Sequence, residues 1–150
     1  MQKNEPKESN SVISKSLDIA TRAHHGQWDI SGDPVILHPL AVGLMGKTPD
    51  EICAGFLHDV AEDTSVTFDD MIAEGIPANI VEALKLLTHS KDIPYLDYVK
   101  GIIASGNSLA IATKLNDLTH NLERGRRMGY NRLVAKHSSA LEEFRKAGLA

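Results

Sequence analysis

The residues best suited to chemistry lie in the segment Gly-Phe-Leu-His-Asp-Val-Ala-Glu-Asp-Thr at positions 55–64. In a helix, Glu62 lies four residues after His58 and Asp63 four residues after Asp59, so the four side chains share one surface. The residues before them are mostly apolar and are expected to be buried. Four ionisable groups at the end of an apolar helix are costly unless they are paired. A divalent cation, which pairs a histidine with several carboxylates, is therefore the first hypothesis.

A second polar cluster is predicted on the helix that follows Asn107. Lys114, Asp117 and Asn121 are spaced three and four residues apart, so they share a face beside the apolar stripe of that helix. Asp117 is thus expected at the border of the core, with a cationic donor and an amide as neighbours. Two interpretations stay open here: Asp117 is a structural aspartate paired with Lys114, or it is a metal ligand that comes from a distant helix.

A histidine at a helix start completes the candidate ligand set. His38 precedes Pro39, which suits the first position of a helix, so His38 is expected at the N-terminal boundary. His38, His58, Asp59 and Asp117 then supply two imidazoles and two carboxylates. This mixture suits Mn²⁺, Fe²⁺ or Zn²⁺ and is too rich in nitrogen for a typical Mg²⁺ or Ca²⁺ site. A six-coordinate ion would keep open positions for a water and a substrate oxygen, as metal-assisted hydrolysis requires.

The elements that must position these residues are helices, because apolar residues recur with helical spacing and no convincing alternating strand or repeat is present. We predict an all-α bundle of about seven or eight helices, with a flexible N-terminus at residues 1–10 and a single domain over residues 11–150. Thr48 and Asn107 are expected to cap their helices. The predicted helices run from about Ser11 to Gly26, from Pro39 to Gly46, from Thr48 through the His58–Asp59 pair, from Thr67 to Gly75, from Pro77 onward, from Asp92 to Ser105, from Asn107 to about Gly125 and from Tyr130 to Lys146.

Composition excludes several classes of function. The net charge of -4 gives no general electrostatic attraction to nucleic acid or to an anionic membrane, and no apolar run approaches membrane-spanning length. The N-terminus is polar and does not resemble a signal peptide. The single cysteine, Cys53, lies in an apolar run and is predicted to be a buried thiol in a reducing compartment. The expected location is cytoplasmic, and the sequence does not indicate an oligomeric state.

The order His, His-Asp, Asp resembles the signature of the HD-domain metal-dependent phosphohydrolases. The longer pattern is narrower and resembles the hydrolase domain of RelA/SpoT-type enzymes, whose free-standing relatives, the small alarmone hydrolases, have a similar length. The resemblance covers the chain from about Ile19 to Arg124. The segments that carry it are Ala23–Gln27, Ile36–Val42, Phe56–Thr64 and Lys114–Leu122.

This resemblance implies an activity and a role for individual residues. His38, His58, Asp59 and Asp117 match the family's Mn²⁺ ligands, although another divalent transition metal fits the same donors. Glu62 and Asp63 match the acidic pair that positions or deprotonates the attacking water, and Asn121 matches a residue that contacts the nucleotide sugar. The implied reaction, part of the stringent response, hydrolyses the 3′-pyrophosphate of ppGpp or pppGpp and releases pyrophosphate. Lys114 is a candidate for stabilising the charge that develops on phosphorus.

The residues that would select the nucleotide depart from the family pattern. Trp28 and Asp29 stand where the family has a basic pair, and Leu118 stands where it has an arginine. Trp28 is a candidate platform for stacking on a base, or simply a lid for the core. Arg124 belongs to a basic cluster that can grip phosphates, although cations are also favoured at a helix C-terminus.

These departures leave two alternatives beside the alarmone reaction. The protein can be an HD phosphohydrolase for another phosphorylated nucleotide or metabolite, or a nucleotide-binding module without turnover. The intact pair Glu62 and Asp63 argues against the second alternative. The other histidines receive no catalytic assignment. We interpret His89 and His137 as surface or helix-end residues, His120 as a packed or exposed residue, and neither His24 nor His25 as a ligand.

Overall fold

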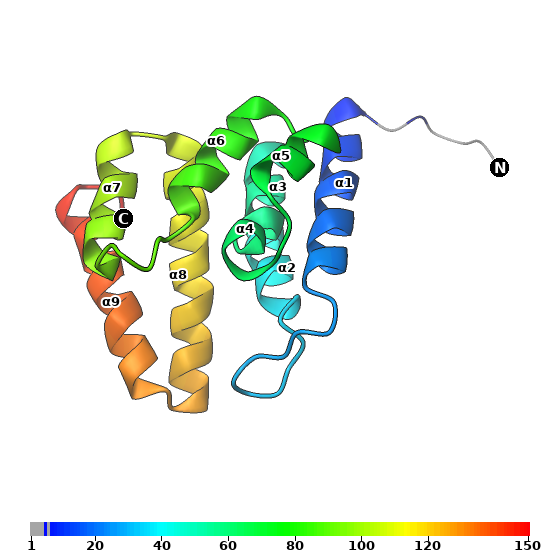
Figure 1. Ribbon diagram of the computed structural model, residues 1–150. Coiled ribbons are helices and arrows are strands. Elements are labelled where there is room, and N and C mark those ends of the chain that lie inside the picture. Colours follow the sequence, from blue (N-terminus) through cyan, green and yellow to red (C-terminus); the bar gives the residue numbers. More distant parts are fainter. Residues whose placement is uncertain (1–4, 6) are drawn as a thin grey trace.

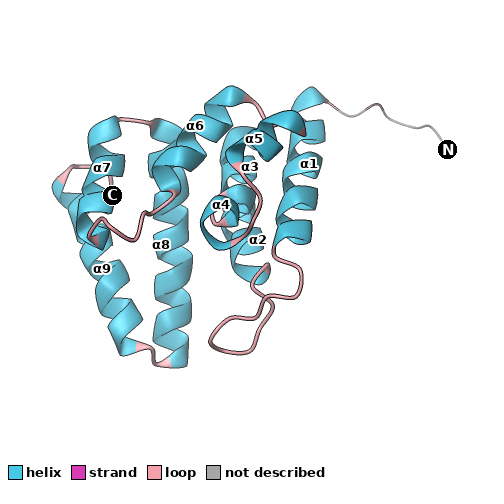
Figure 2. Ribbon diagram, viewed as in Figure 1, coloured by secondary structure: helices cyan, strands magenta, loops and turns pink. Residues whose placement is uncertain are grey.

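Helices account for all the regular secondary structure that the computed structural model describes, which covers residue 5 and residues 7–150 (Figures 1 and 2). The all-α class is therefore confirmed. Strand-like pairing in this part of the chain is limited to one bridge between Trp28 and Pro34. The helices are α1 (Glu8–Ala23), α2 (Leu37–Leu44), α3 (Pro49–Leu57), α4 (Val60–Asp63), α5 (Phe68–Ala73), α6 (Ala78–Leu87), α7 (Tyr95–Ser105), α8 (Ser108–Met128) and α9 (Asn131–Lys146).

The largest difference from the predicted helices lies at the His-Asp pair. We expected one continuous helix through His58 and Asp59, but α3 ends at Leu57 and the single turn α4 begins at Val60. Asp59 has φ -102° and ψ -2°, outside the usual helical range. His58 and Asp59 therefore lie in a turn between two helices.

Two helix ends also differ from the predicted boundaries. The first helix begins at Glu8 rather than Ser11, and the acidic side chain of Glu8 suits the first turn of a helix. Half of the predicted flexible N-terminus, residues 1–4 and 6, lies outside the described residues, and residues 8–10 belong to α1. Helix α8 runs past Gly125 to Met128, and Gly129 ends it with a positive φ of 74°. Thr48 and Asn107 accept bonds from Glu51 N and Ala110 N, so both predicted caps are confirmed.

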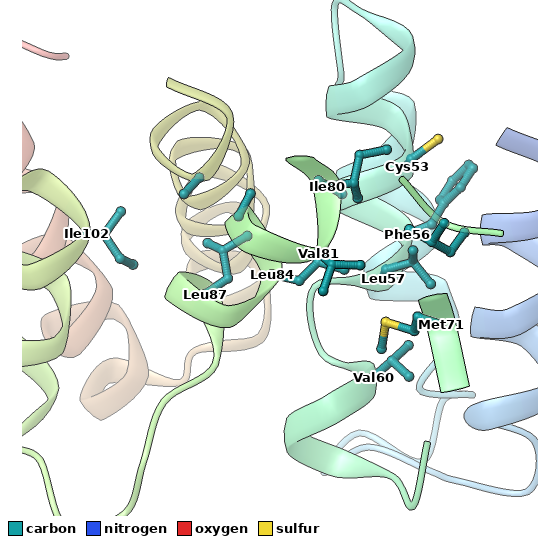
Figure 3. Packing of buried hydrophobic residues seen from close by; sticks show 14 of the residues in the cluster. Cys53, Phe56, Leu57, Val60, Met71, Ile80, Val81, Leu84, Leu87 and Ile102 are labelled. Carbon is teal, nitrogen blue, oxygen red and sulfur yellow. The ribbon is translucent and has the colours of Figure 1, made fainter. Parts of the chain in front are cut away.

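Helix α3 lies at the centre of the fold, where it packs against α1, α2, α6 and α8 (Figure 1). Its residues from Cys53 to Leu57 are all buried, and they join side chains from α5 and α6 in the core, as Figure 3 shows. On the far side of α8, helices α7 and α9 pack against each other. The thiol of Cys53 is buried, as predicted. In the part of the chain described, no helix has the length and apolar character needed to cross a membrane.

Two glycines allow α2 and α3 to approach each other at backbone distance. A Cβ atom added to Gly55 would lie 2.6 Å from both the Cα and the N of Gly43. A Cβ atom added to Gly43 would collide with the ring of Phe56. His38 lies in the first turn of α2 and His58 directly follows α3, so this contact fixes the separation of two candidate metal ligands.

We expect the Gly55→Ala substitution to lower the free energy of unfolding by about 1–3 kcal/mol, because the added methyl group meets backbone that cannot move aside. Gly101→Ala is the matched control. Gly101 lies inside α7 with no atom within 4 Å of the added Cβ, so the free energy of unfolding of this variant should rise by roughly 0.5–1 kcal/mol. Urea unfolding of both variants measures the difference, and equal stabilities would contradict the close packing.

Candidate active site

A polar cavity of about 240 Å³ lies where α2, the His58–Asp59 turn, α8 and α9 meet. Eight of the ten predicted site residues line it, and Trp28 and Arg124 do not. The lining also includes Leu87 and five side chains with polar or charged groups that we had not assigned to the site. The eight predicted residues are His38, His58, Asp59, Glu62, Asp63, Lys114, Asp117 and Asn121; the five others are His89, Tyr95, Tyr98, Lys136 and His137.

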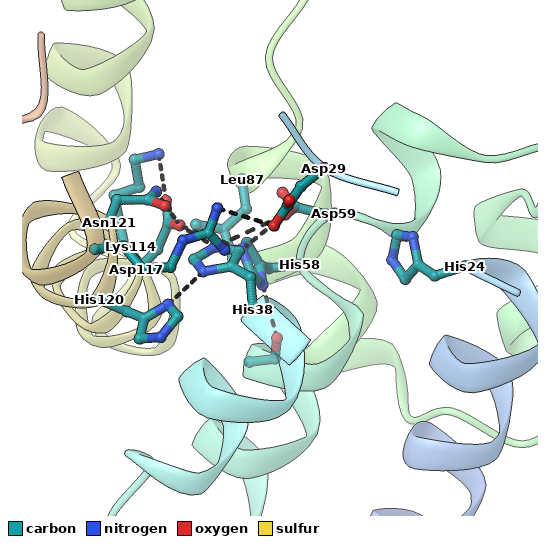
Figure 4. A network of polar contacts seen from close by, with 12 residues as sticks. His24, Asp29, His38, His58, Asp59, Leu87, Lys114, Asp117, His120 and Asn121 are labelled. Atoms are coloured by element: carbon teal, nitrogen blue, oxygen red, sulfur yellow. Dashed lines mark hydrogen bonds and ion pairs between the residues drawn. The ribbon is translucent and has the colours of Figure 1, made fainter. Parts of the chain in front are cut away.

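The four predicted ligands converge from three separate parts of the chain (Figure 4). His38 Nε2 lies 2.8 Å from Asp117 Oδ1 and 3.9 Å from Asp59 Oδ2. His58 Nε2 lies 3.2 Å from Asp59 Oδ2 and 3.4 Å from Asp117 Oδ1. Helices α2 and α8 and the turn after α3 thus bring two ring nitrogens and a carboxylate oxygen of Asp117 together, with a carboxylate oxygen of Asp59 beside His58.

These distances fit a shared metal ion. Two ligands that each lie about 2.1 Å from one ion are roughly 3.0 Å apart at a right angle and roughly 3.4 Å apart at the tetrahedral angle. The observed separations of 2.8 to 3.9 Å cover that range. One donor atom from each of His38, His58 and Asp117 also lies within 4.8 Å of the other two. These three donors can therefore reach a common ion without a large movement of the helices, whereas Asp59 lies outside this group and contacts it through His58.

His58 gives a second sign of a cation at this point. Its Nδ1 donates to the carbonyl oxygen of Gly55 at 2.7 Å, which orients the ring. Its Nε2 is buried and forms no well-aligned hydrogen bond with a described residue, although carboxylate oxygens of Asp59 and Asp117 lie 3.2 Å and 3.4 Å away. Burial alone would lower the pKa of His58, but the carboxylates of Asp59 and Asp117 outweigh it and raise that pKa well above the usual value. The cluster therefore favours positive charge at Nε2.

Asp117 is the most constrained of the four candidate ligands. Lys114 Nζ lies 2.8 Å from its Oδ2, and Asn121 Nδ2 donates to its Oδ1 at 2.9 Å. Burial opposes the charge of Asp117, but Lys114 and the two histidines hold the pKa of this carboxyl well below its usual value. Burial likewise opposes the charge of Lys114, yet Asp117 raises the pKa of the ammonium group well above normal. The predicted pairing of Lys114 with Asp117 is thus present, inside a cluster that also fits a metal ion.

The acidic pair after the turn lies at the open edge of the cavity. Both Glu62 and Asp63 are exposed, and Glu62 Oε1 accepts a hydrogen bond from His89 N at 2.6 Å. Partial burial against the cavity wall, together with the charges of Asp59 and Glu62, raises the pKa of Asp63 to about 6. Asp63, whose pKa lies close to neutral pH, therefore lines the cavity beside the candidate ligands and is suited to proton transfer.

The loop with the departures from the family pattern contacts α8 through an ion pair. Asp29 Oδ2 lies 3.3 Å from Arg124 Nη2, and Asp29 Oδ1 also accepts from the backbone N–H groups of Ser31 and Asp33. Arg124 therefore binds this loop rather than lining the cavity. Trp28 is 68% exposed, so it does not cover the core.

Two of the histidines line the cavity, although we had not assigned them to the site. His137 lies within α9 with a buried Nδ1, so the surface or helix-end interpretation is wrong for it. His89 lies just beyond the end of α6, in agreement with the helix-end interpretation. His120 packs against His38, with their Nδ1 atoms 2.7 Å apart. His24 is buried on the far side of the turn and bonds Gln27, away from the ligand cluster (Figure 4).

The chain is similar to RelA/SpoT-type proteins over most of its length. The bifunctional (p)ppGpp synthase/hydrolase SpoT of Escherichia coli K12 is 32% identical over 129 residues, which cover 78% of this chain and 18% of that protein. A GTP pyrophosphokinase of Streptomyces antibioticus is 30% identical over 154 residues, which cover 94% of this chain and 18% of that protein. The chain thus spans less than a fifth of the length of these curated relatives. No family model matches it.

A shorter match and a solved structure agree with this similarity. A guanosine-3′,5′-bis(diphosphate) 3′-pyrophosphohydrolase of Borreliella burgdorferi is 42% identical over 66 residues, 41% of this chain and 10% of that protein. A solved structure, described as a metazoan SpoT orthologue that hydrolyses ppGpp, has a TM-score of 0.60 and 21% identity. It covers 99% of this chain and 100% of that one. The resemblance seen in the sequence is therefore confirmed, and the solved structure shows that the two proteins share a fold.

Proposed function

We propose that this chain hydrolyses the 3′-pyrophosphate of ppGpp or pppGpp in a reaction that depends on a divalent metal ion, with Mn²⁺ as the preferred ion. The observation that carries the proposal is the convergence of His38, His58, Asp59 and Asp117 beside two exposed carboxylates in one cavity. The names of the relatives support the choice of substrate, since SpoT is a (p)ppGpp synthase/hydrolase and the Borreliella protein is a 3′-pyrophosphohydrolase.

The proposed reaction breaks one phosphorus–oxygen bond. The oxygen of a water molecule bonds to the phosphorus attached to the ribose 3′ oxygen, and the bond between that phosphorus and the 3′ oxygen breaks. The 3′ oxygen takes up a proton, and pyrophosphate leaves with the oxygen of the water. A bound divalent ion would lower the pKa of water and polarise the phosphoryl oxygens, which is the chemistry that this reaction needs.

The chain's own residues supply proton transfer and positioning. Glu62, held by the backbone N–H of His89, lies on the cavity wall where it can accept a proton from the attacking water. Asp63, with its raised pKa, is the second group in position to carry that proton. Lys114 is buried and stays charged, so it can stabilise negative charge on the phosphoryl group. Asn121 orients Asp117 and lines the cavity, where it can contact the nucleotide sugar.

A panel of substrates tests the proposed function. Purified protein is incubated with ppGpp, pppGpp, ppApp, NADPH and a generic phosphodiester, and the release of pyrophosphate and phosphate is measured with Mn²⁺ and with EDTA. We expect pyrophosphate from ppGpp and pppGpp only when Mn²⁺ is present. Turnover of only another member of the panel would show that the substrate is a different compound, although the metal-dependent mechanism would stand. Tight binding of ppGpp without release of pyrophosphate or phosphate would identify a binding module.

His120 is expected to tune the affinity of the metal site through His38. Burial and the neighbouring side chains of His38 and Arg124 lower the pKa of His120, which favours a neutral ring whose Nδ1 accepts from His38 Nδ1–H. We expect His120→Phe, which keeps the ring but removes the acceptor, to weaken Mn²⁺ binding about 10–100-fold in calorimetric titrations. His25→Phe, at an exposed position, is the control, and equal Mn²⁺ affinities in the two variants would contradict this role.

A further inference from the structure

One end of the cavity contains cationic and hydrogen-bonding groups, of which the proposed reaction uses only Lys114. Tyr95 comes from α7, Lys114 from α8, and Lys136 and His137 from α9. The two ammonium groups lie 5.4 Å (Lys114) and 4.3 Å (Lys136) from the centre of the Tyr95 ring. The ring of His137 stands at 80° to the ring of Tyr95, with their centres 6.3 Å apart.

Two buried polar atoms in this group have no partner in the part of the chain that the structure describes. They are the hydroxyl oxygen of Tyr95 and Nδ1 of His137. The neighbouring Tyr98 differs, because its hydroxyl donates to the carbonyl oxygen of Leu87 at 2.6 Å. Buried polar groups are normally hydrogen-bonded, and an exception calls for a ligand or a function. Both unpaired atoms belong to residues that line the same cavity, which points to a ligand there.

The electrostatics of this end favour an anion. Lys114 is buried with its ammonium group 2.8 Å from the carboxylate of Asp117, and Lys136 adds a second cation that forms no ion pair with any described residue. Burial lowers the pKa of His137 to about 4, so its ring is neutral at neutral pH and can donate one hydrogen bond without a charge of its own. The carboxylates of Asp59 and Asp117 lie around His38 and His58, and Glu62 is held by the backbone N–H of His89, whose ring contacts Tyr95. At the Tyr95 end, two ammonium groups and two unpaired polar atoms lie together, which suits an anion.

We propose that Tyr95, Lys114, Lys136 and His137 bind the outer phosphate of a diphosphate group whose inner phosphate lies at the metal-ligand cluster. The proposal rests on the proposed function, which places the inner phosphorus beside those ligands. Lys114 joins the two halves, because its ammonium group is 2.8 Å from the carboxylate of Asp117. The two phosphates of a diphosphate share one oxygen, so the outer phosphate must lie directly beside the inner one. This subsite would make the protein select diphosphate esters over simple phosphate esters.

The test compares the binding of inorganic pyrophosphate with that of orthophosphate to the Mn²⁺-loaded protein, by calorimetry with Mn²⁺ in excess over the anion. We expect Tyr95→Phe and Lys136→Met each to weaken pyrophosphate binding by about tenfold or more, because each removes a hydrogen bond to a charged group. The affinity of the same variants for orthophosphate, which needs only the metal-ligand cluster, should change by less than about twofold. Lys100→Met is the charge-matched control, since Lys100 is exposed on α7 and does not line the cavity.

Folding defects can be separated from loss of the subsite. Tyr95→Phe removes a hydroxyl that bonds no described residue, so its thermal midpoint should match or exceed that of the wild type. Pyrophosphate affinities within about twofold of the wild type in both variants, or equal losses for pyrophosphate and orthophosphate, would overturn the proposal.

The same data separate this inference from the proposed function, because binding does not require turnover. If the wild-type protein does not hydrolyse ppGpp but the variants selectively lose pyrophosphate affinity, the proposed reaction is wrong and the subsite is supported. If the variants hydrolyse ppGpp and bind pyrophosphate as tightly as the wild type, the subsite is wrong and the proposed reaction is supported.

Discussion

We expect the Asp59→Asn variant to have a Mn²⁺ affinity and a turnover rate that are each reduced by more than about 100-fold. Removing a group that merely supports a metal ligand already lowers metal affinity or activity by 10–100-fold. The change removes one charge and one good ligand atom while the side-chain shape stays the same. Asp59 suits the test because its side chain is 27% exposed and makes no cap hydrogen bond, so the fold does not depend on it. Asp117 suits it less, because its loss would leave the buried Lys114 without a counter-charge.

The matched control for this variant is Asp69→Asn, which removes the same charge from an exposed position on α5. Calorimetric titration with Mn²⁺ and an assay of ppGpp turnover should show wild-type behaviour for the control. A wild-type Mn²⁺ affinity in Asp59→Asn would remove this carboxylate from the ligand set.

The Glu62→Gln variant is expected to keep the metal ion and to lose about 10²–10⁴-fold in turnover, which is the usual contribution of a general base. Glutamine retains an oxygen that can accept from His89 N, so the 2.6 Å contact that holds this side chain is preserved. Only the ability to accept a proton is lost. The expected result is therefore a large fall in kcat with an unchanged Mn²⁺ affinity.

Glu82→Gln provides the control, because Glu82 is an exposed acid on α6 whose ion pair with Lys85 lies at the surface. Normal turnover in Glu62→Gln would take Glu62 out of the mechanism. Asp63, the neighbouring carboxylate with the raised pKa, would then be the remaining candidate for the base.

The parts of the site that local spacing controls could be predicted from the sequence. Lys114, Asp117 and Asn121 share a helix, so their spacing of three and four residues alone placed them together. The His-Asp pair was recognised for the chemistry of its side chains, but the turn at His58 and Asp59 was not predicted. A continuous helix would direct their side chains differently, and local propensity does not reveal a break of two residues in an apolar helix.

The unpredicted residues come from contacts between distant elements. Tyr95 and His137 belong to helices whose own patterns show only apolar stripes, and they meet because α7 packs on α9 beside α8. The ion pair of Asp29 with Arg124 likewise joins a loop to a helix far along the chain. A hint was present for His137, which lies on the closing helix close to Lys136, but one sequence cannot show which face of that helix turns inward. Manganese as the native ion and the cytoplasmic location stay predictions.

The most direct measurement is the product analysis of ppGpp incubated with the purified chain, once with Mn²⁺ and once with EDTA. The proposed function predicts GDP and pyrophosphate in equal amounts with Mn²⁺ and neither product with EDTA. Equal turnover in EDTA would contradict the role of the metal ligands. Intact ppGpp in the presence of protein with bound Mn²⁺ would contradict the reaction itself.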